Sequence, residues 1–416
     1  MVAKTPKSIK FGGNEMNAVG IDVSKGRSTV AVMRPFGEIV VSPFEVIHTD
    51  SELGSLAKLL KSLKGETKIV MECTGAYHLP VAHTLYRAGL SVSAVNPQLT
   101  HDFGNNTIRK SRSDKLDSVK IANYALANWL DLPKYQPEAE IRQSLKSHSR
   151  QYNHYNKIKT MLKNNLISLL DQTFPGLNKL FTSSARESDG HEKWLDFTEH
   201  FWHCECVGSL SLKVFTERYR KWCRRSGYYC VGADEVHALA RSCVAVMPKS
   251  ESIKSLITQA AKQINFIAET LAATAREMKR LAALLPEHDI VMEFYGVGDI
   301  LGSQLMAEIG NIYNYTKKSS LVRFAGLEPV ENSSGDFHGD EKISKQGSPH
   351  LRKTLFQVMD CILQNAPKDN SVFQFLDRKR AQGKHYYSYM CAGAAKFLRI
   401  YYARVKQRLD SLYSEN

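Results

Sequence analysis

The chain has 416 residues, enough for two or three domains with sizeable hydrophobic cores. Hydrophobic residues make up 43% of it and charged residues 24%, as in soluble globular proteins. No apolar run reaches the ~18 residues that a bilayer-spanning helix needs, so we expect no membrane insertion. Lysine and arginine outnumber aspartate and glutamate by 56 to 42, a balance that favours a polyanionic partner, nucleic acid before an anionic membrane surface.

The first residues and the cysteines indicate a cytoplasmic protein. Residues 1–16 are basic but lack the apolar segment of a secretory signal, and we expect them to be a disordered leader. Eight cysteines in such a chain should stay reduced. Five of them follow His203 closely in the sequence, at Cys204, Cys206, Cys223, Cys230 and Cys243. Their spacing matches no usual zinc motif, so buried free thiols are favoured over a zinc site.

The N-terminal part has the element order of a mixed β-sheet covered by helices. We expect three sequential antiparallel strands at residues 18–22, 28–33 and 38–42. After them come an expected helix at 51–63, a strand at 68–71, a helix at 78–88 and a strand at 91–95. Three antiparallel strands followed by strand–helix–strand units are the order of a ribonuclease-H-like fold, with helices on both faces of the sheet.

Four acids fall at positions where such a fold would gather them. Asp22 ends the first strand and Glu72 ends the fourth, and these strands are neighbours in the expected sheet. Asp114 and Asp117 lie three residues apart in the run KSRSDKLDS, which puts both carboxylates on one face of a helix. Because such close like charges repel, a hard divalent cation, Mg²⁺ or Mn²⁺, would neutralise them.

Each acid also has an ordinary structural explanation. Asp114 could cap a helix that starts near Lys115, with Asp117 in the first turn, where acids complement the helix dipole. Asp22 and Glu72 could be acids of solvated turns. The occurrence of all four in this order favours a metal-binding site that activates an oxygen nucleophile against a phosphodiester.

The middle of the chain contains two long helical patterns, at residues 137–170 and 250–285. We expect an antiparallel pair, either a dimerising coiled coil or two ordinary bundle helices, which the sequence cannot separate. Residues 173–249 between them are expected to be an irregular, aromatic and cysteine-rich insertion. Farther on, we expect a Gly-x-Gly turn and a short helix at residues 294–310. They could be one half of a helix-hairpin-helix, whose turn amides bind a DNA phosphate, or a helix–turn–helix unit that only packs in the core. Helices are expected at about 372–380 and 386–412.

A second group of candidate catalytic residues lies in a serine-containing segment. Residues 321–355 include a Ser-Ser-Gly loop and basic residues, among them Arg352 and Lys353 at the head of a helix. A serine hydroxyl can attack a phosphodiester while cations hold the phosphate and stabilise developing charge. The alternative is a flexible polar loop with solvated lysines. The cations that we expect to contact nucleic acid are Lys110, Arg112, Lys115, Lys342, Lys345, Arg352 and Lys353.

Together these motifs resemble the DEDD-type, serine-dependent insertion-sequence transposases, relatives of the Piv/MooV DNA invertases, some of which are guided by a bridge RNA. The N-terminal match runs over residues 18–128 and includes GIDVSK, MECTGAYHLPVAHTLYRAG, VNPQ and SRSDKLDS. The C-terminal match covers about 290–365 and includes GVGDILGSQLMAEIG, FAGLEP, NSSG and ISKQGSPHLRKTL. The usual Lys-Thr-Asp-x-x-Asp-Ala motif reads RSDKLDS here, at residues 112–118.

The resemblance implies an α/β plus α architecture: a RuvC-like, RNase H-like domain at 17–132, a coiled-coil or helical region at 133–286 with the insertion at 173–249, and a mainly α transposase domain at 287–416. It implies metal-dependent catalysis, with Mg²⁺ or Mn²⁺ bound by Asp22, Glu72, Asp114 and Asp117. Ser334 would be the nucleophile, with Ser333 as the alternative. The expected partners are double-stranded donor and target DNA, a guide RNA in some members, and further copies of the chain in a dimer or tetramer. The expected location is the bacterial cytoplasm, in association with the nucleoid.

Three other functions fit parts of the sequence. A RuvC-like or RNase H-like nuclease would use water, with Ser334 merely structural. A basic scaffold with a decayed catalytic core would bind nucleic acid without any metal-dependent activity. An actin-like phosphotransferase is a weaker option, because no second phosphate loop is evident. The same chemistry serves transposition and inversion, so both outcomes remain open.

Overall fold

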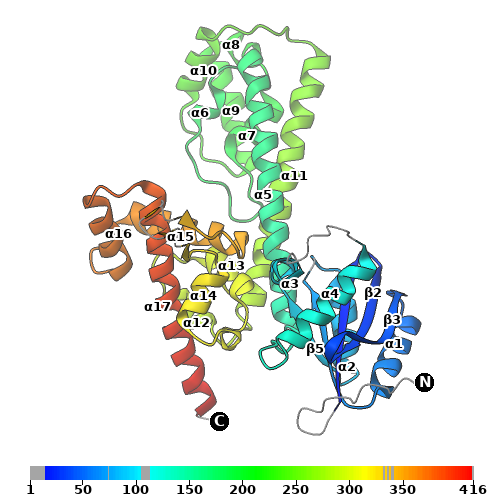
Figure 1. Cartoon of the computed structure of the whole chain (residues 1–416). Helices are drawn as coiled ribbons and strands as arrows, with labels where there is room; N and C mark the ends of the chain where they lie inside the picture. The colour runs from blue at the N-terminus through cyan, green and yellow to red at the C-terminus, as the bar shows by residue number, and fades with distance from the viewer. Residues whose placement is uncertain are drawn as a thin grey trace, which may run out of the picture. The chain divides into compact units, whose positions relative to one another are not determined.

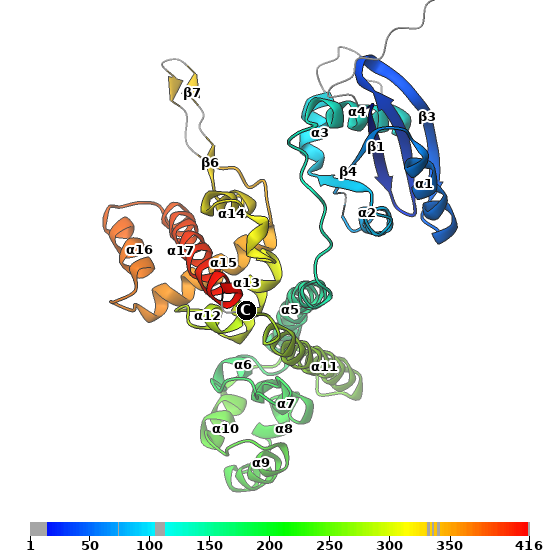
Figure 2. The same cartoon turned by 90° about the horizontal axis from the view of Figure 1, so that it is seen from below.

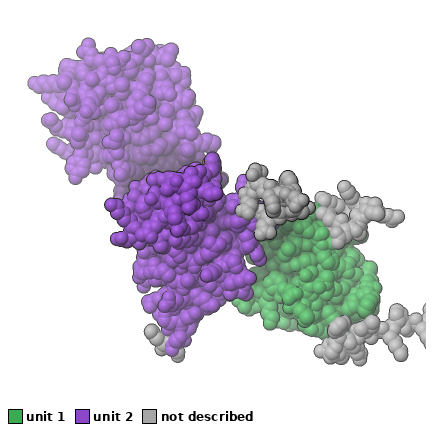
Figure 3. Space-filling model, turned by 60° about the vertical axis from the view of Figure 1, so that its left-hand side comes forward, with its two compact units in different colours: residues 1–137 green, residues 138–416 purple. Residues whose placement is uncertain are grey.

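The computed structural model describes residues 15–73, 75–104, 113–330, 333–334, 337–338 and 342–414, with the backbone alone for 104, 330, 333–334, 337–338 and 342. Most of the expected leader, Lys110 and Arg112 lie outside the described residues. The chain divides into two compact units, 1–137 and 138–416, which Figure 3 colours separately. The expected transposase domain, and all but the first five residues of the expected helical region, fall within the second unit. None of the described helices has the length and apolar character that crossing a bilayer requires.

The first unit is a five-stranded mixed sheet with helices on both faces (Figure 1). Its elements are β1 (Met16–Ser24), β2 (Arg27–Arg34), β3 (Glu38–Ile47), α1 (Asp50–Ser62), β4 (Glu66–Glu72), α2 (His78–Arg87), β5 (Ser91–Val95), α3 (Pro97–Gly104) and α4 (Asp114–Ala127). The strand order is β3-β2-β1-β4-β5. The first three strands pair antiparallel, while β4 and β5 run parallel to β1. The sequence-based prediction of a mixed sheet with the ribonuclease-H-like element order is confirmed.

The side chains of β1 alternate between the two faces of the sheet, and each face packs against a separate layer of helices. Successive residues of a strand point to opposite faces, so Val19, Ile21 and Val23 share one face. They lie in the larger cluster with the buried residues of α1 and α2. Ala18 faces the other way and packs in a cluster with residues of α4 and Trp129. The face of β1 that carries Ala18 is therefore the one covered by α4.

Helix α4 begins one residue earlier than a cap at Asp114 would require. Ser113 is the N-cap, and its hydroxyl accepts a hydrogen bond from the Leu116 amide at 3.3 Å. Asp114 is the first helical residue, and Asp117 lies in the same first turn. The alternative in which Asp114 caps the helix is therefore wrong, because the serine before it does this. Both carboxylates remain near the positive end of the helix dipole.

The second unit is built around two long helices, α5 (Glu140–Thr173) and α11 (Glu251–Ala282), which lie side by side in Figures 1 and 2. Both helices were predicted, with bounds within a few residues. A buried ion pair fixes one end of α5: the Arg142 guanidinium donates to both carboxylate oxygens of Glu287. Glu287 is 2% exposed at its side chain.

The segment between these helices is helical, and the expectation of an irregular insertion is wrong. It contains α6 (Leu177–Leu180), α7 (Lys193–His200), α8 (Glu205–Gly208), α9 (Leu212–Ser226) and α10 (Ala233–Ser242). These helices gather at one end of the α5–α11 pair (Figure 1). Their aromatic residues had suggested an irregular segment. Phe215, Tyr219 and Trp222 nevertheless follow helical spacing and form a buried core with the ends of α5 and α11.

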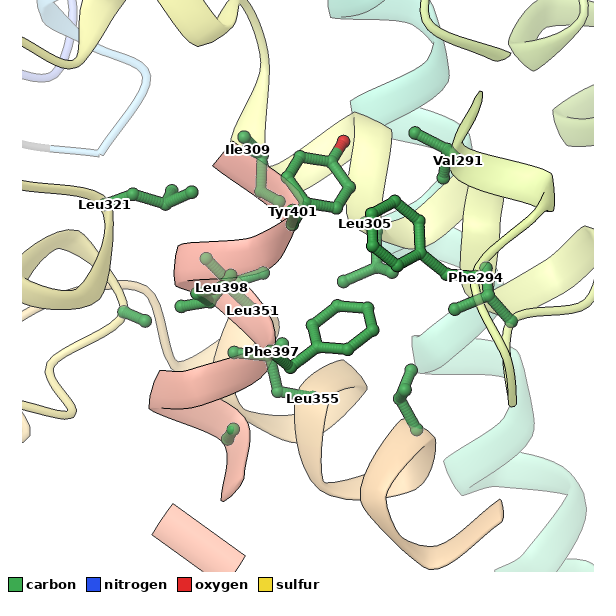
Figure 4. Packing of buried hydrophobic residues seen from close by; sticks show 14 of the residues in the cluster. Val291, Phe294, Leu305, Ile309, Leu321, Leu351, Leu355, Phe397, Leu398 and Tyr401 are labelled. Atoms are coloured by element: carbon green, nitrogen blue, oxygen red, sulfur yellow. The ribbon is translucent and has the colours of Figure 1, made fainter. Parts of the chain in front are cut away.

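The rest of the second unit packs around the opposite part of the α5–α11 pair. Its helices are α12 (His288–Met292), α13 (Asp299–Ile309), α14 (Lys318–Phe324), α15 (Pro349–Asn365), α16 (Ser371–Ala381) and α17 (Tyr386–Ser414). Figure 4 shows their common core, in which Phe294 stacks on Tyr401 of α17 with ring centroids 5.6 Å apart. Residues 302–309 of α13 are all buried, so this helix, expected after the Gly-x-Gly turn, is part of the core.

Candidate active site

Two of the predicted acids lie on adjacent parallel strands at the same end of the sheet. The last residue pair of the β1–β4 ladder is Ile21 with Met71. Asp22 and Glu72 each follow directly, so their backbones lie side by side where the two strands stop pairing. Asp22 alternates with Ile21, and it therefore lies on the face of β1 that α4 covers.

A glycine lets α4 come close enough to bring the other two acids to this place. Gly20 shares a face with Asp22, because the two residues are two apart in a strand. A Cβ atom at position 20 would overlap the backbone of Ser118 and of Ala122. The first turn of α4, which carries Asp114 and Asp117, is thus held against the strand that carries Asp22.

The four carboxylates interact electrostatically. The pKa of Asp22 is raised from 3.8 to about 6, first by burial and then by the charges of Asp114, Glu72 and Asp117. A divalent cation would relieve this repulsion, and four carboxylates are the hard oxygen donors that Mg²⁺ and Mn²⁺ prefer. Among the described residues, no three His, Cys, Asp or Glu side chains are grouped tightly enough to hold an ion, so binding one would require side-chain movement.

Two further contacts position the acids. The Thr100 hydroxyl in α3 donates to Glu72 Oε1 at 2.5 Å and lies 2.9 Å from the carbonyl oxygen of Pro97. Lys120 Nζ donates to Asp117 Oδ1 at 2.9 Å, one turn along α4. Sequence reasoning missed Thr100, a residue that is 3% exposed. The available signal was the Asn-Pro break after β5, which starts α3 beside the end of β4.

The predicted basic residues near the acids are only partly described. Lys115 is exposed in the first turn of α4. Lys110 and Arg112 lie outside the described residues.

The predicted serines belong to the second unit and lie on a short strand, where a loop was expected. β7 (Ser333–Ser334) pairs antiparallel with β8 (Phe337–His338), with Ser333 opposite His338 and Ser334 opposite Phe337. A second ladder joins β6 (Pro329–Val330) to β9 (Lys342–Ile343). Figure 2 shows β7 beyond β6, away from the helices α15 and α17. The serine side chains and that of Lys342 are not described.

Close backbone contacts fix the chain at the base of the β6–β9 ladder, where the ladder joins the helices of the second unit. The Lys345 amide donates to the Gly326 carbonyl at 3.1 Å, and the Ser348 amide donates to that of Phe324 at 2.8 Å. Gly347 has a φ of 152°, and a Cβ there would overlap the Phe324 carbonyl. Lys345 itself has a left-handed φ of 54°. The chain around Lys345 therefore has little conformational freedom.

Three of the predicted cations line one cavity at this base. The cavity has a volume of about 1090 Å³, and Lys345, Arg352 and Lys353 all contribute to its wall. The other polar, charged and aromatic lining residues include Phe356, Phe375, His385, Tyr387 and Arg399. Burial and the nearby charge of Lys157 lower the pKa of Lys353. Cations beside aromatic rings are suited to an anionic, partly aromatic ligand such as a nucleotide.

A buried carboxylate orients the helix that presents Arg352 and Lys353. Glu308 of α13 is 2% exposed and accepts hydrogen bonds from Arg150 Nε at 3.0 Å and from the Ser348 hydroxyl at 3.1 Å. Ser348 is also the N-cap of α15, accepting from the Leu351 amide at 3.1 Å. The position of α15 is thus tied to α5 and α13 through one carboxylate.

The predicted site residues therefore occupy both units. Asp22, Glu72, Asp114 and Asp117 come together in the first unit, while the serines, Lys345, Arg352 and Lys353 belong to the second. All eight cysteines are free in the described part of the chain. Of the five that follow His203, Cys204 and Cys223 are buried as expected, Cys206 and Cys243 are half-buried, and Cys230 is exposed.

Comparison with known proteins relates both parts of the chain to transposases. A family model of DEDD transposases of the IS110 type matches residues 19–175, and one described as "Transposase IS116/IS110/IS902 family" matches residues 288–373. The two matches together cover more than half of the chain. The "Insertion element IS116 uncharacterized 44.8 kDa protein" of Streptomyces clavuligerus is 22% identical over 335 residues, which is 79% of this chain and 81% of that protein. The "Pilin gene-inverting protein" of Moraxella lacunata is 23% identical over 341 residues, 82% of this chain and 80% of that protein.

Proposed function

Because the chain belongs to the IS116/IS110/IS902 family of transposases, and is thus a DNA transposase or recombinase, we propose that it cuts and rejoins DNA with a serine nucleophile and the four acids of the first unit. The observation that carries this proposal is the placement of Asp22 and Glu72 at the ends of paired strands, against which Gly20 lets the first turn of α4 pack with Asp114 and Asp117. The raised pKa of Asp22, caused by burial and by Asp114, Glu72 and Asp117, agrees with this placement. A positive charge placed among these carboxylates would relieve their repulsion, which makes the group a candidate cation site.

The DEDD family implies a divalent metal, and the four carboxylates fit one. Asp22, Glu72, Asp114 and Asp117 would hold Mg²⁺ or Mn²⁺. When bound, the metal would supply Lewis-acid stabilisation of the charge that develops on the scissile phosphate. Thr100 keeps the Glu72 carboxylate in place through its hydrogen bond, and Lys120 does the same for Asp117.

The nucleophile we propose is the hydroxyl of Ser334, with Ser333 as the alternative. Attack by the serine oxygen on phosphorus forms a phosphoserine ester and breaks one phosphorus–oxygen bond of the DNA. The serine loses its proton, and the departing DNA oxygen gains one. Attack by a hydroxyl of another DNA end then reverses the step and restores the serine. The phosphodiester energy is retained in the protein–DNA bond, so rejoining needs no external energy source.

Lys345, Arg352 and Lys353 are proposed to bind the DNA phosphates next to the serine-bearing strand. Their cavity lies at the base of the β6–β9 ladder, and Glu308 and Ser348 hold the start of α15 in place. Guanidinium and ammonium groups at fixed positions can stabilise phosphate charge without reorganising during the reaction.

A guide RNA, a dimeric or tetrameric state and nucleoid association are further proposals that derive from the family resemblance. The net charge of +14 supports a polyanionic partner but does not distinguish RNA from DNA. The acids and the serines belong to different units of the chain. One copy of the chain could therefore supply the acids and a second copy the serine. Measuring the size of the DNA-bound protein would test this arrangement.

The test is covalent trapping on supercoiled DNA that carries the element ends, with Mg²⁺ present and any element-encoded RNA added. We expect DNA attached to the peptide that contains residues 333–334 in a denaturing gel, followed by peptide mapping. Ser334→Ala should abolish the adduct while Ser333→Ala retains it, and Asp114→Asn should abolish it as well.

The other outcomes lead to different functions. Metal-dependent nicks without an adduct, persisting in Ser334→Ala, would indicate a nuclease that uses water. Tight binding with neither nick nor adduct, with and without the RNA, would indicate a nucleic-acid-binding scaffold.

A further inference from the structure

Helix α9 carries a concentration of positive charge that the proposed catalytic site does not use. It lies in the segment 176–287, outside both family matches. The sequence of α9, LKVFTERYRKWCRRS, contains six lysines and arginines and a single acid, Glu217. All six cations are exposed. They are Lys213, Arg218, Arg220, Lys221, Arg224 and Arg225.

The two faces of α9 have separate roles. Phe215, Tyr219 and Trp222 recur at helical spacing and are buried in the core of this helical region. Arg218, Lys221 and Arg225 also recur at helical spacing, on an exposed face about a quarter-turn around the helix from those rings. Seven residues of helix span about 10 Å, so these three cations form a row about two turns long.

No carboxylate neutralises this row. Among the described residues of the chain, none of the six cations of α9 forms an ion pair, not even with Glu217. Two acids of the same helical region have other partners: Asp196 accepts hydrogen bonds from Arg186, Tyr228 and Asn265. Glu192 pairs with Lys159 and Lys163 of α5. Six like charges on four turns of helix repel one another, which is a cost that an anionic partner would remove.

The helix that carries this row is fixed at both of its ends. Ser211 caps the start of α9 by accepting from the Val214 amide, and Gly227, with a φ of 72°, ends it. The guanidinium of Arg186 donates to the carbonyl of Ser226 in the last turn. Figure 2 shows α9 at the outer edge of the group formed by α6–α10. Because the backbone of α9 is already fixed, binding a regular array of phosphates would order the side chains of the row but not the helix that carries them.

We propose that the face of α9 formed by Arg218, Lys221 and Arg225 binds the phosphate backbone of duplex DNA. Cations alone contact phosphates and read no bases, so this surface binds DNA without sequence preference. The aromatic rings of the helix are buried and cannot stack on unpaired bases, which favours a duplex over a single strand. The choice of DNA over RNA rests on the proposed function, whereas the presence of a phosphate-binding surface does not.

The experiment measures binding of the full-length chain to a fluorescent 40-base-pair duplex without element sequence, in EDTA, over a series of salt concentrations. The triple variant Arg218→Gln, Lys221→Gln, Arg225→Gln should bind at least tenfold more weakly at 100 mM salt. Each lost phosphate contact lowers the slope of log K against log[salt] by about 0.9, so the slope should fall by about 2 to 3. Equal affinity and equal slope would overturn the proposal.

A matched control removes three charges elsewhere. Lys58, Lys61 and Lys64 are exposed on or just after α1, a helix on the face of the sheet opposite α4. Their triple glutamine variant should keep the wild-type slope to within about 1; a fall as large as that of the α9 variant would mean that net charge alone decides, against the proposal. Both variants should retain the wild-type far-UV circular dichroism and melting temperature, because the six positions are exposed.

Two further measurements decide the type of nucleic acid. Tyr229, which is 89% exposed just after α9, should be replaceable by alanine with no effect on duplex binding. A loss of single-strand or RNA binding in the triple variant, with duplex DNA binding unchanged, would overturn the assignment to duplex DNA, as would a loss of duplex binding in Tyr229→Ala. Because EDTA prevents metal-dependent cleavage, an inactive catalytic site would leave this result unchanged.

Discussion

Gly20 of β1 lies against the backbone of Ser118 in α4, with no room between them for a side chain. Any Cβ at position 20 would also overlap the amide nitrogen of Ala122. Because Asp22 follows two residues later on the same face, this contact sets how near Asp114 and Asp117 come to it. The arrangement of the four acids thus depends on a residue that has no functional group.

Gly20→Ala should therefore displace α4 and impair both stability and DNA cleavage. Overpacking of this kind costs about 1–3 kcal/mol, which thermal or urea unfolding would detect. The control is Gly54→Ala in α1, where a new Cβ has open space and no left-handed φ. That change should stabilise the chain by up to about 1 kcal/mol, since alanine is the better helix former. Equal stability of the two variants would show that α4 can move away from β1 without cost.

The raised pKa of Asp22 predicts opposite effects of one substitution with and without metal. In EDTA at pH 7.5, Asp22→Asn should raise the melting temperature, because it removes a partly buried charge that three other carboxylates repel. In Mg²⁺, wild type should gain stability, about 2.7 kcal/mol at a hundred times the dissociation constant, and the variant should gain much less. Calorimetry with Mg²⁺ and Ca²⁺ would measure both effects.

The control for the metal effect is Asp102→Asn, at an acid of α3 that does not contribute to the pKa of Asp22. It should respond to Mg²⁺ as wild type does. If Asp22→Asn lowered the melting temperature in EDTA, the four acids would not form a repelling group in the absence of a metal ion.

The strand order and the places of the first two acids could be predicted from the sequence because they depend on local patterns. Alternation, the Pro-Phe-Gly turn and the acids that follow β-rich runs all lie within a few residues of one another. The helix that carries Asp114 and Asp117 was predicted in the same way. The alternative of a cap at Asp114 was wrong by one residue, since Ser113 and Asp114 are both good N-cap residues and only the backbone of the folded chain distinguishes them.

The contacts that join distant segments could not be predicted. The role of Gly20 depends on how close α4 approaches, and the contact between Thr100 and Glu72 spans 28 residues. The segment 173–249 was misread because aromatic and cysteine residues are typical of irregular insertions as well as of buried helix faces. Its short helices become recognisable only when α5 and α11 supply the rest of their core.

Lys345 allows backbone strain and charge to be separated. Its φ of 54° suits glycine better than any other residue, so Lys345→Gly should be more stable than Lys345→Gln by about 1 kcal/mol. Both variants lose the same positive charge from the cavity at the base of the β6–β9 ladder. Both should therefore reduce DNA cleavage to a similar extent. Activity that follows stability instead, with the glycine variant near wild type, would show that the ammonium group does not contact DNA.

The carboxylate of Glu192 gives the second unit a dependence on acidic pH. Burial raises its pKa, but hydrogen bonds from Lys163, Trp194 and Lys159 outweigh this and lower the pKa from 4.5 to about 2. A lowered carboxyl pKa contributes stability that is complete above the unfolded value near 4.5 and is lost as the pH falls toward 2. Glu192→Gln should therefore cost about 2 kcal/mol at pH 7 and progressively less below pH 4.5, as measured by urea unfolding.

The matched control for this prediction is Glu251→Gln, at an exposed carboxylate 3.0 Å from Lys254 in the first turn of α11. Water screens that pair, so the substitution should change the free energy of unfolding by less than about 1 kcal/mol at any pH. The informative quantity is the difference between wild type and Glu192→Gln as the pH is lowered from 7 to 3. A difference that stays constant over this range would mean that Glu192 titrates alike in the folded and unfolded chain, and that its two lysines do not stabilise its charge.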